Sequence, residues 1–399
     1  MKRKISIAPF VIIFLIIILL NWYVGSALLT ISSSVYTLPI FGLFLVLVTG
    51  SLFYAIRRMA KHGIDLFFKI ASHAVLILLA AELVMAITLI PEDIYVLVSG
   101  STRSIYWVEA SFLIMLLMIL LFLYGMIFGK YKYQLISHTL YFDDLPEQFD
   151  GFKLVQISDV HAGSFNNPKA VQRGIDLINA QKADVFVFTG DLVNNKAEEI
   201  KPWISTFSQI KAPYGQFSIL GNHDYGDYVP WKNDLEKRNN LQQLKTYHQE
   251  LGFQLLMDNH VQLIKGDQHI ILAGVENWGI GFGERGDLKK ALAGTSTDEF
   301  KILLSHDPSH WESQVKNFSN KVQLTLAGHT HGMQFGLEAF GIKWSPVKYR
   351  YAHWAGIKEE NGRILNINRG FGFLGFSGRI GIWPEVTLIE FKKKPANTP

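Results

Sequence analysis

The first third of the chain is dominated by four long apolar runs. Each run approaches the ~20 residues with which a helix crosses a ~30 Å hydrocarbon core. Helices buried in soluble proteins seldom stay apolar for so long, so the pattern predicts a transmembrane domain of about four helices over residues 1–128. The first run lies between Lys2-Arg3-Lys4 and Gly25-Ser26-Ala27 and has the outline of a cleaved signal peptide, but its length favours an uncleaved span. The runs are Ile5–Val24, Leu38–Ile56, Phe67–Ile90 and Trp107–Phe128.

Behind the fourth run, short apolar stretches alternate with polar clusters. Helices are predicted at Asn167–Gln181 and Ile200–Ile210. Five of the predicted strands end in a polar cluster, and ligand sites of α/β sheets lie beyond the carboxyl ends of strands. The pattern therefore predicts an α/β domain over residues 133–391, with a site at these strand ends and a short tail at 392–399. The strands are predicted at Tyr133–Leu140, Phe152–Ile157, Val185–Thr189, Tyr214–Leu220, Lys301–Leu304 and Val322–Ala327.

Composition and charge narrow the class of protein. Charged residues make up 18% of the chain and hydrophobic residues 49%. The charged share is below the ~25% of soluble proteins, which argues against a wholly soluble protein, and the hydrophobic share excludes disorder. The chain has no cysteine, which excludes disulfides, thiolate metal sites and cysteine nucleophiles. Residues 1–128 hold eight Lys/Arg against five Asp/Glu, whereas the remainder holds 30 against 29. The basic excess therefore belongs to the membrane part, and no nucleic-acid partner is expected.

The distribution of Lys and Arg between the short loops predicts the topology. Positive residues flank the N-terminus, the segment of Arg57, Arg58 and Lys61, and the segment after the fourth run, whereas residues 91–106 carry only Arg103. We therefore expect an integral, multi-pass protein of the cell (inner) membrane with its C-terminal α/β domain in the cytoplasm. Glu82 lies inside the third run, where an ionisable group indicates either a functional site or a helix–helix hydrogen bond.

The polar clusters carry oxygen and imidazole donors without sulfur. Such a set suits Mn, Fe, Zn or Co, whereas an all-oxygen set would indicate Mg or Ca. The clusters offer seven candidate metal ligands, more than one catalytic ion binds when it keeps a position open for water. Two ions that share one carboxylate would account for seven ligands. The clusters are Asp159-x-His161, Gly190-Asp191, Gly221-Asn222-His223-Asp224, Ser305-His306-Asp307 and Gly328-His329-Thr330-His331.

In this order, and each behind a strand, the clusters resemble the calcineurin-like metallophosphoesterase superfamily. The segment Gln156–His161, which is QISDVH, together with Arg369-Gly370 and Pro384–Thr387, is similar to the bacterial membrane-associated branch. The resemblance implies a four-layer αββα sandwich with two divalent ions at the sheet edges. It implies that Asp159, His161, Asp191 and His331 hold one ion, and that Asp191, Asn222, His306 and His329 hold the other. His223 matches the family's non-ligand histidine, which serves the leaving group and is expected to be catalytic.

Two positions depart from the family's patterns. The phosphoprotein-phosphatase branch has an acidic residue where this chain has Asn194, which argues against that branch. The membrane-associated branch usually continues its Gly-His-Thr-His with Gly-Gly-Gln. Here the chain has Gly332-Met333-Gln334, a change expected at the rim of the pocket that removes no ligand.

The function expected from these features is membrane-anchored hydrolysis of a phosphoester or pyrophosphate bond in a phosphorylated small molecule or lipid. Two alternatives stay open, a phosphodiesterase of soluble nucleotides and a non-enzymatic membrane sensor that binds a phosphorylated ligand. A lipid-linked substrate is suggested by an aromatic and basic segment over residues 332–383, although many of its aromatic side chains could instead complete a core. Its members are Phe335, Phe340, Trp344, Tyr349, Tyr351, Trp354, Phe371, Phe373, Phe376 and Trp383, with Lys343, Lys348, Arg350, Arg369 and Arg379 interleaved.

Overall fold

The computed structural model describes residues 8–63, 65–339 and 341–395. Lys2, Arg3, Lys4 and Phe340, which entered the predictions above, lie outside the described residues. The chain divides into two compact units, Met1–Tyr124 and Gly125–Pro399. Each unit is described by itself below.

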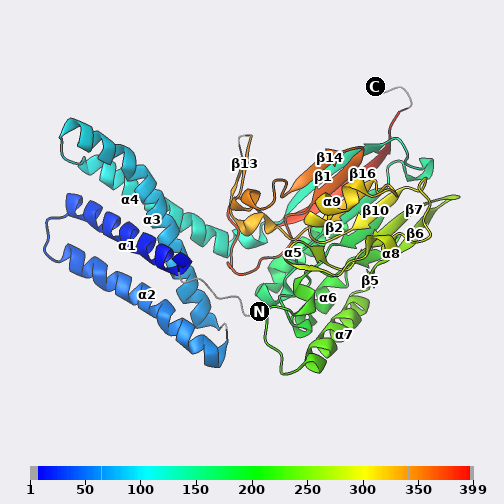
Figure 1. Cartoon of the computed structure of the whole chain (residues 1–399), viewed down its shortest axis with the longest axis horizontal. Coiled ribbons are helices and arrows are strands. Elements are labelled where there is room, and N and C mark those ends of the chain that lie inside the picture. The colour runs from blue at the N-terminus through cyan, green and yellow to red at the C-terminus, as the bar shows by residue number, and fades with distance from the viewer. Residues whose placement is uncertain (1–7, 64, 340, 396–399) are drawn as a thin grey trace. The chain divides into compact units, whose positions relative to one another are not determined.

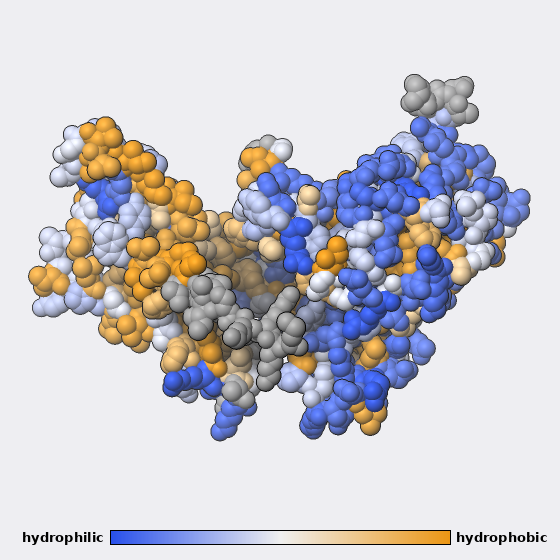
Figure 2. Space-filling model, in the orientation of Figure 1, coloured by the Kyte–Doolittle hydropathy of each residue, from blue (hydrophilic) through white to orange (hydrophobic). Residues whose placement is uncertain are grey.

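The first unit contains four helices that are long and apolar enough to span a membrane. They are α1 (Ala8–Ile31), α2 (Thr37–His62), α3 (Leu66–Ser99) and α4 (Ile105–Ile127), shown in blue to cyan in Figure 1. Figure 2 shows hydrophobic side chains over most of the visible surface of these helices. The four predicted spans are confirmed, although α1, α2 and α3 extend beyond the apolar runs.

The structure of the membrane unit bears on two expectations from the sequence, the position of its basic residues and the role of Glu82. Arg57, Arg58 and Lys61 belong to the last turns of α2, not to a loop. Glu82 of α3 is fully buried, and neither oxygen of its carboxyl group has a hydrogen-bond partner among the described residues. The helix–helix hydrogen bond considered for Glu82 is therefore not seen in the described part of the chain.

Two six-stranded sheets form the second unit (Figure 1). The first sheet has the order β1 (Gln134–Phe142), β16 (Glu385–Lys393), β2 (Lys153–Ile157), β3 (Val185–Phe188), β4 (Gln216–Ser218) and β5 (Gln254–Leu255). The second has the order β14 (Gly356–Glu360), β15 (Arg363–Ile367), β11 (Leu324–Ala327), β10 (Lys301–Leu304), β7 (Gln268–Gly274) and β6 (Asn259–Lys265).

Alternating side chains along the strands build three core layers. Val185 and Val187 of β3 point into the core between the two sheets, whereas Phe186 and Phe188 point to the opposite face. That face is covered by α5 (Pro168–Ala180), α6 (Ile204–Phe207) and α7 (Asp234–Glu250). The outer face of the second sheet is covered by α8 (Leu288–Ala291) and α9 (Ser309–Ser313). The predicted four-layer αββα sandwich is confirmed.

Two predicted segments differ from the structure. The predicted helix Ile200–Ile210 is α-helical only over Ile204–Phe207, because a 3-10 turn over Lys201–Trp203, which contains Pro202, precedes it. The strand β16 runs to Lys393 because it pairs with β1 up to Phe142, so it enters the segment predicted as a tail.

The aromatic and basic segment is not one continuous surface. Phe371 and Phe373 are buried in the core between the first sheet and its helices, and Arg379 is fully buried. Tyr349, by contrast, is 79% exposed. Two stretches of the aromatic and basic segment form the small hairpin of β12 (Leu337–Ala339) and β13 (Ile342–Trp344). Core packing therefore accounts for part of the aromatic content that suggested a lipid surface.

Candidate metal centre

The carboxyl ends of five strands bring the predicted site residues together. In the first sheet, β2, β3 and β4 are parallel neighbours and are followed by Asp159, Asp191 and Asn222 respectively. In the second sheet, β10 and β11 are parallel neighbours and are followed by His306 and by His329. Because parallel strands end at the same edge, both sheets deliver their polar clusters to one place.

The donor atoms converge in two groups. Asp159, His161 and His331 form one group, and their donor atoms all lie within 4.8 Å of one another. The Nε2 atoms of His161 and His331 are 2.9 Å apart. Donors around a tetrahedral ion at about 2.0–2.2 Å lie roughly 3.3 Å from each other, so this group has the spacing that a divalent ion needs.

Asp191, His306 and His329 form the second group. Asn222 joins it, because its Oδ1 lies 2.9 Å from Nδ1 of His329. Oδ2 of Asp191 lies 3.2 Å from Nε2 of His306 and 3.6 Å from Nε2 of His161, a ring of the first group. The carboxylate of Asp191 therefore stands between the two groups, where a bridging ligand would have to be.

The backbone at this site is strained. Five of the seven predicted ligands have a left-handed φ, between 47° and 69°, a region that costs non-glycine residues about 1–3 kcal/mol each. Two of the neighbouring glycines are required by close approach. A Cβ on Gly221 would meet Oδ1 of Asp191 at 2.2 Å, and a Cβ on Gly328 would meet Oγ of Ser158 at 1.9 Å. The five left-handed ligands are Asp159, His161, Asp191, His329 and His331.

Burial and neighbouring charges prepare these side chains for cations. Burial lowers the pKa of His161 to about 3 and that of His329 to about 4, so both rings stay neutral, which is the form that binds metal. Burial opposes ionisation of Asp191, but His306 and His223 hold the pKa of its carboxyl group well below the usual range. Burial alone would lower the pKa of His306, yet the Asp191 carboxylate raises it to about 10, so a cation that binds there has to displace the proton of this ring.

A surrounding layer of groups orients the rings, and most of it was missed by the sequence analysis. Nδ1 of His306 lies 2.7 Å from the carbonyl oxygen of Thr189, which turns Nε2 toward Asp191. Oδ2 of Asp307 lies 3.3 Å from Nε2 of His329, which leaves Nδ1 for the centre. Of these orienting groups, only Asp307 could have been suggested by the sequence, because it lies next to His306.

Asp224 connects two of the loops that carry candidate metal ligands. Its carboxylate accepts hydrogen bonds from the backbone N–H groups of Asp191, Leu192, Val193 and Gly221, at 2.8–3.2 Å. The loop after β3 and the loop after β4 are thereby held in one arrangement. The motif Gly-Asn-His-Asp therefore combines two predicted site residues with a residue that positions them.

Comparison with known proteins agrees with this geometry. Residues 152–333 match the family model "Calcineurin-like phosphoesterase", and residues 3–130 match "Probable Calcineurin-like phosphoesterase, transmembrane domain". The chain carries a calcineurin-like phosphoesterase domain behind a phosphoesterase transmembrane domain. Members of this family hydrolyse phosphoesters with divalent metals, and the two donor groups fit that use.

Relatives come from bacteria and animals. The chain is 29% identical to "Uncharacterized metallophosphoesterase YkuE" of Bacillus subtilis, over 64% of this chain and 84% of the relative. It is 26% identical to "Transmembrane protein with metallophosphoesterase domain" of Danio rerio, over 74% of this chain and 64% of the relative. The match to "Uncharacterized metallophosphoesterase" of Aquifex aeolicus is 25% identical, over 65% of this chain and 91% of the relative. A solved phosphopantetheinyl hydrolase from Mycobacterium tuberculosis aligns with 63% of this chain and 99% of its own, at 10% identity and a TM-score of 0.37, which is too low to carry an argument.

His223 occupies a distinct place in the phosphoesterase domain. It belongs to neither donor group, and its ring lies 5.0 Å from that of His161 and 4.5 Å from that of Tyr228. Its Nδ1 lies 2.7 Å from the carbonyl oxygen of Asn194, so Nδ1 carries the proton and Nε2 is left for other partners. The residue at which the chain departs from the phosphoprotein-phosphatase branch thus orients His223 through its backbone.

The metal centre opens into a hollow of about 200 Å³, which His223, Phe282 and Tyr351 help to line. Met333 stands at its rim, is 51% exposed, and has a φ of 48°. The departure from the membrane-associated branch therefore changes the rim of the hollow, as expected, and displaces none of the seven predicted ligands.

Proposed function

We propose that the chain is a membrane-anchored phosphoesterase that uses two divalent ions to hydrolyse a phosphoester or pyrophosphate bond. The observation that carries this proposal is the position of Asp191, whose Oδ2 lies within 3.6 Å of a ring nitrogen from each donor group. Asp159, His161, Asp191 and His331 hold one ion, and Asp191, Asn222, His306 and His329 hold the other. The nitrogen and oxygen donors suit Mn, Fe, Zn or Co.

The side chains of the site indicate separate roles for the bound ions and for His223. Divalent ions bound there supply an activated water and compensate the charge on the phosphoryl oxygens. In its doubly protonated form, His223 donates the Nε2 proton to the departing oxygen and keeps the Nδ1 proton on the carbonyl of Asn194. Asp159, Asp191 and His306 are almost fully buried, which strengthens their electrostatic contacts.

The substrate is proposed to be linked to lipid and presented at the cytoplasmic membrane surface. The last transmembrane helix ends at Ile127 and the first strand begins at Gln134. Six intervening residues reach at most about 22 Å even when fully extended, and a 3-10 turn over Gly129–Tyr131 shortens that reach further. The connection therefore keeps the start of the phosphoesterase domain close to the headgroups.

A substrate panel tests this proposal. Full-length protein in lipid nanodiscs with added Mn²⁺ is assayed on lipid-linked phosphodiesters and pyrophosphates and on their water-soluble headgroup analogues. We expect hydrolysis, with a kcat/KM at least tenfold higher for the lipid-linked members. Equal kcat/KM for both would contradict the lipid linkage and favour a phosphodiesterase of soluble nucleotides. A protein that is loaded with metal and inert on every member would contradict the enzyme and favour a membrane sensor.

A further inference from the structure

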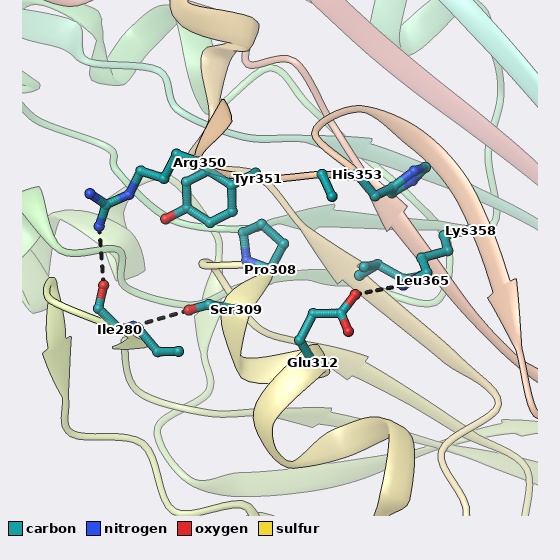
Figure 3. Close-up of a pocket in the computed structure, with 10 residues that line it drawn as sticks. Ile280, Pro308, Ser309, Glu312, Arg350, Tyr351, His353, Lys358 and Leu365 are labelled. Carbon is teal, nitrogen blue, oxygen red and sulfur yellow. Dashed lines mark hydrogen bonds and ion pairs between the residues drawn. The ribbon is translucent and has the colours of Figure 1, made fainter. Parts of the chain in front are cut away.

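A second cavity of about 530 Å³ lies next to the metal centre. We call it the side pocket and define it by Ile280, Pro308, Glu312, Arg350, Tyr351 and Lys358, which are among its lining residues. Figure 3 shows Pro308, Ser309 and Glu312 on the segment that includes α9, facing Arg350 and Tyr351 from a later loop. The volume falls within the roughly 300–1,000 Å³ of small-molecule sites, so the side pocket has room for an organic group.

The side pocket shares a wall with the hollow of the metal centre. Arg350 and Tyr351 line both cavities. The ring of His329 lies 5.8 Å from the ring of Tyr351 and 4.5 Å from the ring of Phe282. The guanidinium of Arg350 lies 4.6 Å from the Phe282 ring. The side pocket is therefore reached from the side of the centre where His329 stands.

His223 contacts a different part of the centre. Its ring neighbours are His161 and Tyr228, whereas the wall of the side pocket contacts His329. A phosphoryl group between the two donor groups would thus have His223 on one side and the side pocket on another. If His223 serves the departing oxygen, the side pocket faces a substituent that stays on phosphorus.

The charges of the side pocket describe the group that fits it. Lys358 is already paired with Glu312 at 2.6 Å and with Glu360 at 3.1 Å. Nη2 of Arg350 donates to the carbonyl oxygen of Ile280 at 3.2 Å, and among the described residues Arg350 has no ion pair with a carboxylate. One uncompensated cation thus stands next to the metal hollow. The rest of the lining includes the apolar side chains of Pro308 and Leu365 and the ion pair of Glu312 and Lys358.

We propose that the side pocket binds an uncharged, hydroxyl-bearing organic group that remains on phosphorus, so that the substrate is a phosphodiester. The inference rests on the proposed function and deepens it. The oxygen of water adds to phosphorus, the P–O bond to the leaving group breaks, and the leaving oxygen takes a proton. The product is a phosphomonoester whose organic group still occupies the side pocket. Arg350 faces the negative charge of its phosphate, while Glu312 and Lys358 bind its hydroxyl groups.

Two chromogenic diesters isolate the retained group. Thymidine 5′-(p-nitrophenyl phosphate) and methyl p-nitrophenyl phosphate share the leaving group and the charge, and differ only in what stays on phosphorus. For full-length protein in detergent micelles with Mn²⁺, we expect kcat/KM to be at least tenfold higher for the thymidine diester. Equal kcat/KM for the two diesters would overturn the assignment of the side pocket.

Filling the side pocket provides the matched test. Ala352 lines the pocket and is exposed, so a bulky side chain there can be accommodated without disturbing a core. Ala352→Trp should abolish the tenfold preference, whereas Ala293→Trp, at an exposed alanine that does not line the side pocket, should keep it. An undiminished preference in Ala352→Trp would overturn the inference.

A binding measurement separates this inference from the proposed function. In equilibrium dialysis with thymidine 5′-monophosphate, the retained product, we expect binding to the wild-type protein that Ala352→Trp weakens at least tenfold. Hydrolysis of neither diester, together with inertness on the whole substrate panel, would contradict the proposed function, and the same nucleotide binding would still support the pocket. Hydrolysis of both diesters without any nucleotide binding would overturn the pocket and leave the proposed function standing.

Discussion

Single residues at the metal centre are held in conformations that they would not choose alone. Asp191 has a φ of 61° and His331 a φ of 49°, and such strain persists only where surrounding contacts impose it. The contacts are visible in the hydrogen bonds that Asp224 accepts around the Asp191 loop. The strain turns carboxylate and ring nitrogen atoms inward, which is the arrangement that binding of cations requires.

The role of His223 is tested by removing its ring. His223→Ala should keep the bound metal and lower kcat by about 10²–10⁴-fold, because a general acid contributes about that much. The loss should be smaller for p-nitrophenyl esters, whose leaving group needs little protonation. Turnover of alkyl and p-nitrophenyl esters, measured beside metal content, checks both expectations.

A histidine far from the centre serves as the control for that variant. His269 is paired with Glu299 on the surface of the second sheet, so His269→Ala should leave turnover unchanged. If His223→Ala lost its metal, the residue would be a ligand and the proposed role would be incorrect.

The elements of the fold were largely predictable from local patterns, whereas the contacts between distant segments were not. Apolar stretches that end in polar clusters predicted β2, β3, β10 and β11 to within two residues, because burial on both faces leaves a continuous apolar run. The predicted helix Ile200–Ile210 was wrong over most of its length, since its apolar spacing could not reveal the 3-10 turn around Pro202. The polar clusters indicated which residues meet, but no spacing rule places Arg379 beside them.

Arg379 connects a long loop to the metal centre. Its guanidinium donates to the carbonyl oxygens of Arg369, Gly370 and Gly372, and its Nη2 lies 3.1 Å from Nδ1 of His331. Burial lowers its pKa to about 10, so it stays charged at neutral pH. It therefore satisfies several buried carbonyl groups at once and positions His331.

Removing this guanidinium should destabilise both the loop and the centre. Arg379→Met leaves buried carbonyls unpaired, at a cost of about 3 kcal/mol, so the apparent melting temperature should fall by about 5–10 °C and Mn²⁺ affinity should fall with it. Arg363 also donates to two carbonyl groups, those of Val315 and Phe318, away from the centre. Arg363→Met should lower stability and keep Mn²⁺ affinity, and equal losses of affinity in both variants would contradict a specific role for Arg379. Calorimetry gives both quantities.

At the scale of the whole molecule, the positive residues that predict topology differ in their surroundings. Arg57 and Arg58 lie at the end of α2, and Arg58 pairs with Asp65. Arg103, on the opposite side by the predicted topology, is bonded through two nitrogens to Asp93 at 2.7 Å. The count of Lys and Arg still favours the N-terminus, the end of α2 and the phosphoesterase domain on the cytoplasmic side.

Reporter fusions test this topology. Fusions after Phe128 and within 57–66 should both report a cytoplasmic location, whereas fusions near Arg103 should report the opposite side. Alkaline phosphatase and green fluorescent protein reporters give complementary readouts of the two compartments. An external location for the fusion after Phe128 would contradict the number of spans or the proposed orientation.

Counting the bound metal tests whether two divalent ions share the carboxylate of Asp191. Purified full-length protein, saturated with Mn²⁺ and freed of excess, is analysed by inductively coupled plasma mass spectrometry beside Asp191→Asn. Asp287→Asn is the matched control, because Asp287 caps α8 and asparagine caps equally well. We expect about two ions per chain in the wild type and the control and less than one in Asp191→Asn. One ion per wild-type chain, or two ions retained by Asp191→Asn, would contradict it.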